Sequence, residues 1–344
     1  MTQTLTRWRD LPQAWHGPLL RADFKRQPDD FLVGEELGFT PDGSGEHLFV
    51  EIEKSGLSTF EAQTLLARYC SLSPRDLAFS GMKDKQGITR QWFSLQPGRR
   101  AVALEQFAHP QLRILQMQRN SRKLRRGTHR GNRFRIVLRD CRGDHSDIAA
   151  RLTLLGQRGV PNYFGLQRFG RDEGNVPAAL DWFAGGAAPT RTLRGLLLSA
   201  ARSYLFNALL SARVLDGSWQ HWIPGDLMAL AGTGSVFPAA RATEAELAER
   251  IARFDLCATG PLWGQGELPV TAAALRLEQQ LFVHHASLCA GLEAQGLNQE
   301  RRPLRLAVDA LKHTWDGDNL IVEFRLERGA YATAVLRELL YLEE

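Results

Sequence analysis

One carboxylate with a lysine on each side is the first feature of the sequence that could do chemistry. Asp84 lies between Lys83 and Lys85 in the glycine-bounded segment 81–87. A nearby ammonium keeps an aspartate ionised at neutral pH, as a nucleophile or a strong base requires. A charged surface turn, in which the lysines only solvate an exposed aspartate, is the alternative that these residues leave open.

Two predicted strands carry this loop. A short apolar run around Phe79 precedes it, and the alternating run Gln91–Leu95 follows it. Loops held between rigid strands commonly present catalytic groups. The segment 79–95 is therefore the stretch around which the remaining residues are interpreted.

A strongly basic segment follows the Asp84 loop. Nine lysines and arginines and no acid lie between Arg119 and Arg139, which leaves 34 bases against 38 acids in the rest of the chain. Such a patch indicates contact with a polyanion, although a solvated charged face is the alternative. The side chains expected to contact an RNA backbone are Arg122, Lys123, Arg125, Arg126, Arg130 and Arg133.

The second half of the basic segment alternates as a strand does. Asn132 and Phe134 share one predicted face, and Arg133, Arg135 and Arg139 share the other. One strand would thus offer an arginine row together with an inward-facing amide and aromatic ring.

The segment 160–170 combines aromatic rings, glycines and polar side chains. Aromatic faces beside an arginine suit stacking on unpaired bases, and a packed turn into another domain is the alternative. We expect Asn162, Gln167 and Arg168 either to structure a domain junction or to touch RNA.

Further patterns predict the remaining elements. Helices are expected from the capping box of Ser58 and Glu61 to Cys70, from Ser146 to Leu155, over Leu193–Leu215, after Thr243, over Thr271–Leu292 and over Ala330–Leu340. Strands are expected from Phe31, over His47–Glu53, Gln111–Gln118 and Leu304–Leu311, and through Leu320 to Leu326. A β-rich start, a mostly helical middle over 175–300 and a β-rich end predict a sheet domain interrupted by an insertion.

Composition excludes several classes of protein. The 344 residues allow two domains, and no window reaches the ~18–20 apolar residues of a membrane span. The first residues lack the apolar core of a signal peptide. The four cysteines have no CxxC spacing, and the nine histidines form no ligand pattern. We expect a reduced, cytoplasmic, monomeric protein with no metal.

Three classes of function fit these features. The first is cofactor-free chemistry on an extruded base of a nucleic acid, with Asp84 as the working carboxylate. The second is a metal-dependent nuclease, which would need further carboxylates around a divalent ion. The third is an RNA-binding protein without catalysis. The sequence contains no phosphate-binding P-loop or dinucleotide-binding glycine pattern.

Three long motifs resemble a known family in order along the chain. GMKDKQGITRQWFSL, KLRRGTHRGNRFRIVLR and VPNYFGLQRFG resemble successive motifs of the TruD family of tRNA pseudouridine synthases. Shorter similarities run through LSAARSYLFNALL, GTGSVF and TGPLWGQGEL to ERGAYATAVLREL. The resemblance covers nearly the whole chain.

The resemblance implies a fold, a domain division and a reaction. The fold would be the α+β pseudouridine synthase fold, a large, mainly antiparallel sheet interrupted by a helix-rich family-specific insertion. Residues 1–157 and 305–344 would form the catalytic domain, and residues 158–304 the insertion. The reaction would convert uridine 13 of transfer RNA to pseudouridine without a cofactor or metal.

The resemblance also implies roles for single residues. Asp84 matches the family's essential aspartate, acting by attack on C1′ or by removal of the C2′ proton. Phe31, Asn132 and Tyr331 match substrate contacts, and Tyr331 departs from the phenylalanine common in the family. Three further residues complete the expected site: Phe134 would stack on the extruded uracil, Lys25 would pair with Asp84, and Lys83 is the other candidate for that pair. Core packing is the alternative for Phe31 and Phe134.

Overall fold

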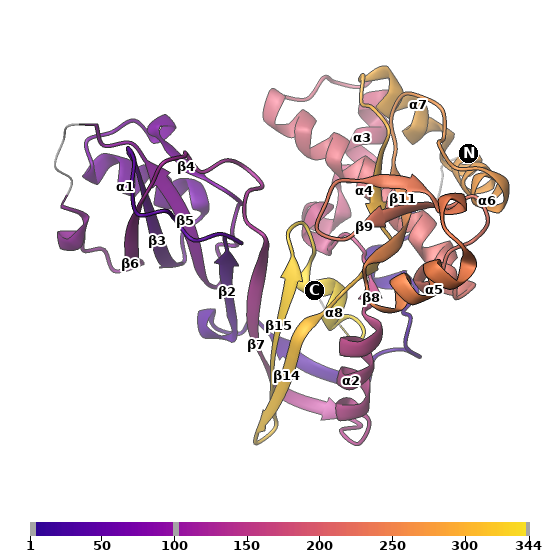
Figure 1. The fold of residues 1–344 in the computed structure, drawn as a ribbon, viewed down its shortest axis with the longest axis horizontal. Helices are drawn as coiled ribbons and strands as arrows, with labels where there is room; N and C mark the ends of the chain where they lie inside the picture. Colours follow the sequence, from indigo (N-terminus) through magenta and orange to yellow (C-terminus); the bar gives the residue numbers. More distant parts are fainter. Residues whose placement is uncertain (1–4, 99–102, 342–344) are drawn as a thin grey trace. The chain divides into compact units, whose positions relative to one another are not determined.

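The chain divides into two compact units, which are described separately. The computed structural model describes residues 5–98 and 103–341 (Figure 1). One unit, here called the sheet unit, comprises residues 20–146 and 308–329. The other, here called the helical unit, comprises residues 1–19, 147–307 and 330–344.

The sheet unit is built on one nine-stranded sheet. Its main strand order is β14-β15-β7-β2-β5-β3-β6, with β1 paired to β7 and β4 paired to β5. Only β2 and β5 run parallel; the other pairs are antiparallel. Its elements are β1 (Leu20–Phe24), β2 (Phe31–Glu36), β3 (His47–Ser55), α1 (Thr59–Tyr69), β4 (Leu77–Phe79), β5 (Ile88–Leu95), β6 (Leu112–Asn120), β7 (Gly131–Gly143), β14 (Asp309–Asp316) and β15 (Asn319–Glu327). The predicted α+β fold with a large, mainly antiparallel sheet is confirmed.

Helix α1 covers one face of this sheet. The predicted capping box forms, because Ser58 accepts from the backbone N–H of Glu61 while Glu61 accepts from that of Ser58. The helix buries Ala62 and Leu66 against side chains of β3 and β5, including Val50. Side chains alternate along a strand, so Phe49 and Trp92 lie on the opposite face, where they pack with Leu37 and Leu124.

Strand β7 pairs with three other strands of the sheet unit. It is 13 residues long, and its first half pairs with β2 on one side and β15 on the other. Its second half pairs with β1. Phe134, Ile136 and Leu138 are buried, as the alternating pattern predicts.

The helical unit is organised around its longest helix, α4, which is 25 residues long. Its elements are α2 (Ile148–Arg158), β8 (Val160–Pro161), α3 (Asn175–Phe183), α4 (Arg191–Leu215), β9 (Leu227–Leu230), β10 (Val236–Pro238), α5 (Glu244–Ala252), β11 (Leu256–Leu262), α6 (Ala272–Phe282), α7 (Ala286–Ala294), β12 (Glu300–Pro303), β13 (Arg305–Leu306) and α8 (Ala332–Leu336). The mostly helical middle therefore also contains a four-stranded sheet, β10-β9-β11-β12, which the sequence did not reveal.

Four predicted elements differ in detail. Ser146 does not cap α2, because its hydroxyl donates to Asp144 and residue 147 is the N-cap. The predicted helix 271–292 is two helices, since a short 3-10 turn at 283–285 separates α6 from α7. Phe282 and Leu288 both reach the core, and a continuous helix would place residues six apart on different sides.

The other two differences lie near the C-terminus. The predicted strand 304–311 is divided, because β13 pairs with β8 and β14 pairs with β15. The predicted helix 330–340 is only the five residues of α8. The residues after it turn back, and Glu338 accepts from the backbone N–H groups of Ala14 and Trp15.

The compact units do not follow the predicted domain borders. Residues 1–19, 147–157 and 330–344 belong to the helical unit, whereas the predicted division places them with the sheet. Hydrogen bonds explain this grouping, since Arg151 donates to the carbonyls of Gly17 and Glu338 and Trp15 donates to that of Gly159. The division into a catalytic domain and an insertion stays a prediction.

Candidate active site

The loop between β4 and β5 presents Asp84 at the surface of the sheet unit. Its Oδ2 accepts a hydrogen bond from Lys25 Nζ at 2.6 Å, and its Oδ1 accepts from the backbone N–H of Gln86 at 3.1 Å. The side chain of Asp84 is 41% exposed, so a ligand can reach the carboxylate. Neither neighbouring lysine pairs with it, because Lys83 binds Glu35 and Lys85 binds Glu61.

Lys25 is held in an unusual backbone conformation directly after β1. Its φ is +59°, a left-handed value that costs a residue with a side chain on the order of 1–3 kcal/mol. Its Nζ lies 4.0 Å from the centre of the Phe31 ring as well as beside Asp84. The ring and the carboxylate together fix the position of the ammonium.

The carboxylate of Asp84 is held in its charged form. Burial raises the pKa of Asp84, but the hydrogen bond and charge of Lys25 and the backbone N–H groups of Gln86 and Lys85 outweigh it and lower the pKa below its usual value. Asp84 is therefore ionised at neutral pH, as a nucleophile or a strong base requires.

A second lysine, on strand β3, holds the main chain of the Asp84 loop. Lys54 lies on β3, is 1% exposed, and its Nζ donates to the main-chain carbonyls of Asp84 at 2.9 Å and Leu57 at 2.6 Å. Burial lowers the pKa of Lys54 to about 8, although the charges of Asp84 and Glu61 oppose that shift. Lys54 thus holds the backbone of Asp84 itself.

A buried ion pair anchors the loop on its other side. Lys83 Nζ lies 2.8 Å from Glu35 Oε2, with side chains 5% and 0% exposed. Burial raises the pKa of Glu35, and Lys83 opposes that rise. The backbone N–H of Lys83 also donates to Thr59 Oγ1 at 2.9 Å, and that hydroxyl donates to Gln91.

Sequence reasoning missed Lys54 and Glu35, although a signal for both was present. Each lies in the buried register of its strand, Lys54 in line with Val50 and Ile52, and Glu35 in line with Phe31 and Val33. A charged residue in an apolar register is rarely fully buried unless it has a partner. That exception to the alternating pattern marks both residues as part of the loop's support.

The predicted substrate contacts of the sheet unit lie on β2 and β7. Val33 is opposite Phe134, and Glu35 is opposite Asn132. The Asn132 Oδ1 is buried and has no hydrogen-bond partner among the residues that the structure describes. Buried polar atoms are rarely left unpaired, so this oxygen lacks the donor that a buried acceptor normally has.

Phe31 and Phe134 are largely buried. Phe134 stacks on Phe324 with ring centres 5.3 Å apart and lies 6.2 Å from Phe31. One face of the Phe134 ring is therefore covered by the core, as the packing alternative expects. Its stacking on a uracil stays a prediction that only the other face or a rotated ring can satisfy.

The predicted RNA-binding arginines and lysine differ in whether another side chain already contacts them. Arg126 lies over the Phe79 ring at 3.9 Å, and Arg133 pairs with Glu36 at 3.4 Å while remaining 73% exposed. Arg139 pairs at 2.7 Å with the fully buried Asp30, which takes it out of the predicted arginine row. The side chains of Arg122, Lys123, Arg125 and Arg130 are exposed.

The remaining predicted site residues belong to the helical unit. Asn162 is buried, donates to the carbonyl of Pro303 at 2.9 Å and accepts from Arg302 at 2.6 Å, and its choice between a structural role and RNA contact stays a prediction. Arg168 donates to the hydroxyl of Tyr331 from Nε at 3.0 Å and to Ser199 from Nη1 at 2.6 Å.

The same hydrogen bonds show what the Tyr331 hydroxyl contributes to the structure. It is the group that a phenylalanine would lack, and it is the acceptor for Arg168. Gln167 is exposed. A Cβ at Gly165 would collide with Thr333 Oγ1 and lie 3.1 Å from the Tyr331 ring, so these neighbours leave little room for a side chain at this position.

A cluster of metal-binding side chains and a membrane-spanning helix are both absent from the described part of the chain. No group of three or more histidine, cysteine, aspartate or glutamate side chains within residues 5–98 and 103–341 could hold a metal ion. No helix in the same residues is long and apolar enough to cross a bilayer.

Comparison with solved structures defines the class of fold. The chain superposes with a TM-score of 0.76 on a Methanosarcina mazei chain whose crystal structure is assigned to tRNA pseudouridine synthase D, with 96% of each chain covered. Identity is 19%, so this similarity shows the fold alone.

Sequence comparison then gives the family. A family model described as tRNA pseudouridine synthase D (TruD) matches residues 14–177 and 181–339. The tRNA pseudouridine synthase D of Pseudomonas putida strain F1 is 46% identical over 337 residues, covering 96% of this chain and 94% of that protein. That of Chromohalobacter salexigens is 44% identical over 339 residues, covering 97% and 96%. The chain belongs to the TruD family.

Proposed function

We propose that this protein isomerises uridine 13 of transfer RNA to pseudouridine, with Asp84 as its single catalytic carboxylate. The observation that carries the proposal is the exposed, ionised carboxylate of Asp84, which forms an ion pair with Lys25, while Lys54 holds the main-chain carbonyl of the same residue. Membership of the TruD family and the printed names of its relatives supply the substrate class.

The reaction breaks the bond between C1′ and N1 and joins C1′ to C5 of the same uracil. C5 loses its proton and N1 gains one, so no atom is added and no electron is exchanged with a second molecule. An ionised Asp84 either attacks C1′ or takes the C2′ proton. Both routes require the uridine to leave its stack so that the ribose reaches the carboxylate.

The other predicted residues have roles in holding the substrate. Asn132 Oδ1 would accept a hydrogen bond from the extruded base, and Phe31 and Phe134 would form the apolar side of its site. Lys25 would keep Asp84 ionised while the base is bound. Tyr331, Gln167 and Arg168 would contribute to RNA contact from the helical unit.

The proposal includes the general properties expected from the sequence. The enzyme would act as a cytoplasmic monomer without a cofactor or metal. Residues 1–157 with 305–344 would form the catalytic domain, and residues 158–304 the family-specific insertion. A metal-dependent nuclease and a non-catalytic RNA-binding protein are the competing outcomes.

Mapping of pseudouridine on a transfer RNA tests the proposal. Unmodified transcripts with uridine or cytidine at position 13 are incubated with wild type, Asp84→Asn or the exposed control Asp29→Asn, and carbodiimide primer extension locates the product. With the uridine transcript, we expect the stop that reports position 13 for wild type and Asp29→Asn but not for Asp84→Asn. We expect no such stop with the cytidine transcript, and EDTA should not reduce the wild-type signal. Strand cleavage, or normal turnover by Asp84→Asn, would overturn the proposal.

A further inference from the structure

A hollow of about 950 Å³ lies on the sheet unit between the segments 39–49 and 120–128. Its main lining residues are Phe39, Asp42, Phe49, Arg122, Lys123 and Arg125, and we call it the Phe39 hollow. The volume is within the roughly 300–1,000 Å³ typical of small-ligand sites. The lining includes none of Lys25, Phe31, Asp84, Asn132 and Phe134, so the hollow is distinct from the Asp84 site.

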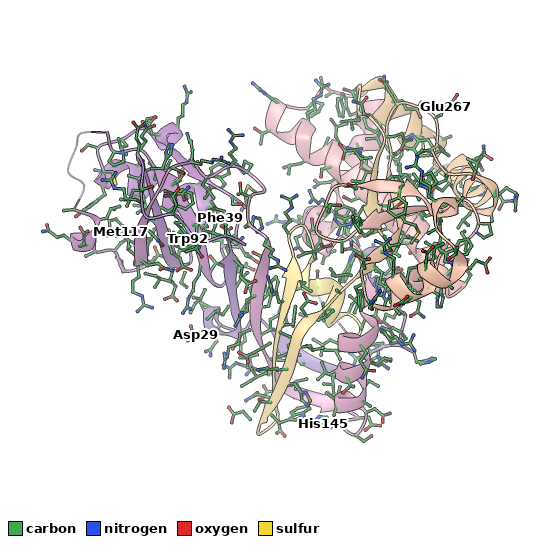
Figure 2. The ribbon with its side chains drawn as sticks, viewed as in Figure 1. Asp29, Phe39, Trp92, Met117, His145 and Glu267 are labelled. Atoms are coloured by element: carbon green, nitrogen blue, oxygen red, sulfur yellow. The ribbon has the colours of Figure 1, made fainter. Side chains whose placement is uncertain are left out.

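Phe39 gives the hollow an exposed aromatic wall. Its side chain is 41% exposed, and its ring contacts that of Phe49 edge to face at 6.2 Å. Phe49 is buried and packs in turn against Trp92, so Phe39 rests on a firm aromatic base (Figure 2 labels Phe39 and Trp92). An exposed ring on a rigid support is the usual platform for an unpaired base.

The charges around the ring favour an anion. Arg122, Lys123 and Arg125 are exposed and have no ion-pair partner in the described parts of the chain, residues 5–98 and 103–341. The opposing charge is Asp42, one ionised carboxylate against three cations, and it accepts from the backbone N–H groups of Ser44 at 2.9 Å and Ser121 at 3.1 Å. The Ser121 hydroxyl and these backbone N–H groups lower the pKa of Asp42 to about 2.

The two segments that line the hollow, 39–49 and 120–128, are held together by hydrogen bonds within the protein. The backbone N–H of Asp42 donates to Asn120 Oδ1 at 3.1 Å, and Asn120 Nδ2 donates to the carbonyl of Arg122 at 2.7 Å. The turn before Phe39 needs glycine, because Gly38 has a φ of +81° and a Cβ there would lie 2.6 Å from that of Arg130. A preformed pocket loses less entropy on binding than a mobile one.

The segment that lines the hollow continues to the loop that carries Asp84. The backbone N–H of Gly127 donates to the carbonyl of Ser80 at 2.9 Å, and that of His129 donates to the Ser80 hydroxyl at 2.8 Å. Ser80 is four residues before Asp84 in the chain. The segment that lines the hollow is therefore hydrogen-bonded directly to the segment that leads into the Asp84 loop.

We propose that the Phe39 hollow binds a second unstacked nucleotide of the RNA whose target uridine reaches Asp84. The base stacks on Phe39, and the flanking phosphates contact Arg122, Lys123 and Arg125. This inference rests on the proposed function, because it assumes that RNA is the substrate. It adds a binding site for a nucleotide that does not react.

Filter binding of an unmodified tRNA transcript to the full-length protein tests the proposal. Phe39→Ala should weaken binding about tenfold, and Phe39→Trp should restore it. The double variant Arg122→Gln/Lys123→Gln should reduce the slope of log K against log salt by about 1.5. Tyr69→Ala and Arg68→Gln/Arg75→Gln are matched controls near α1, which covers the other face of the sheet, and they should bind as wild type does.

Three outcomes decide between the possibilities. Binding by Phe39→Ala at wild-type strength would overturn the proposal, and a changed salt slope without an effect of Phe39 would assign the basic rim to a duplex backbone instead. Failure of the proposed function would give a different result, because Asp84→Asn would then turn over the RNA as wild type does. Loss of turnover in Asp84→Asn together with normal RNA binding by Phe39→Ala would overturn only the second site.

Discussion

Lys25 and Asp84 form a 2.6 Å ion pair although 59 residues separate them in the chain. The pair joins the end of β1 to the loop before β5, and Lys25 adopts a left-handed backbone conformation to make it. The residues next to Asp84 in sequence, Lys83 and Lys85, point to other carboxylates. The charge of Asp84 is thus set by the fold and not by its neighbours in the chain.

Replacing Lys25 with methionine should move the acidic limb of activity to higher pH. Burial raises the pKa of Asp84 and Lys25 is the main opposing influence, so its loss lets the carboxyl protonate at a higher pH. Stability should follow the same sign, because a lowered folded-state pKa contributes stability above the unfolded value that is lost as pH falls through the folded value.

Single-turnover rates between pH 4 and pH 8 measure this shift, because the limb of wild-type Asp84 lies below this range and that of Lys25→Met should enter it. Lys85→Met is the control, since Lys85 pairs with Glu61 on the surface and its acidic limb should match that of wild type. An acidic limb in Lys25→Met at the wild-type position would show that Lys25 does not tune Asp84.

Replacing Lys54 with methionine should slow turnover more than it weakens RNA binding. Lys54 is buried and donates to the main-chain carbonyl of Asp84, so its loss frees the loop without removing any surface contact. Misplacement of a reacting group by about 1 Å can cost on the order of a hundredfold in rate. The measurement is the single-turnover rate and the tRNA dissociation constant of the same variant.

The pH dependence of Lys54→Arg separates positioning from simple loss of folding. The pKa of Lys54 is about 8, and the charged groups around it are Asp84, Lys83 and Glu61. Wild type should lose part of its rate as pH rises through about 8, when the amine becomes neutral. An active Lys54→Arg enzyme should keep that rate because arginine stays charged. The same alkaline loss in Lys54→Arg would contradict the role given to Lys54.

The buried pair of Lys83 and Glu35 should behave as a unit in unfolding experiments. Removing one partner of a buried pair leaves an uncompensated charge and costs about 3–5 kcal/mol, whereas an exposed pair contributes about 1 kcal/mol or less. Glu35→Gln should therefore destabilise strongly, and Glu35→Gln/Lys83→Met should recover most of the loss.

Urea unfolding of the two single variants, the double variant and Lys85→Met measures this coupling. Lys85→Met reports the exposed pair with Glu61 and should change the free energy of unfolding little. Additive effects of Glu35→Gln and Lys83→Met would mean that the two side chains do not depend on each other.

The sequence predicted most elements of the sheet because their side-chain periods are local. The alternation from Asn132 to Leu138 and the capping box at Ser58 both depend on residues within a few positions, and both were found as predicted. The four-stranded sheet of the helical unit was missed because its strands are short; β10 has three residues and β9 has four. Such short runs carry too little periodicity to be distinguished from turns.

The site was harder to predict because its charges pair over long distances. No local pattern links Arg139 to Asp30, or Lys83 to Glu35. The first pair removes Arg139 from the predicted arginine row, and the second removes Lys83 from the candidates to pair with Asp84. The family resemblance named Lys25 as a partner of Asp84, but the support from Lys54 became visible only when β3 and the loop were placed together. The overlooked signal was the presence of charged side chains, Lys54 and Glu35, in the apolar register of their strands.

Replacing Tyr331 with phenylalanine should cost stability while preserving turnover. The hydroxyl of Tyr331 accepts from the guanidinium of Arg168, and a hydrogen bond to a charged group contributes about 1.5–3 kcal/mol. Arg168 keeps its bond to Ser199, which places the expected loss at the lower end of that range. The aromatic ring that the family resemblance assigns to substrate contact is retained. Urea unfolding and primer-extension assays of the same preparation measure the two effects.

Tyr69→Phe is the matched control for this change. Its hydroxyl donates to the carbonyl of Ala103 at 3.0 Å in an exposed, uncharged hydrogen bond, so its removal should change the free energy of unfolding less. Tyr331→Ala then removes the ring as well, and its turnover should fall if the ring contacts RNA. Equal turnover in Tyr331→Ala and Tyr331→Phe would restrict Tyr331 to its bond with Arg168 and remove it from the substrate contacts.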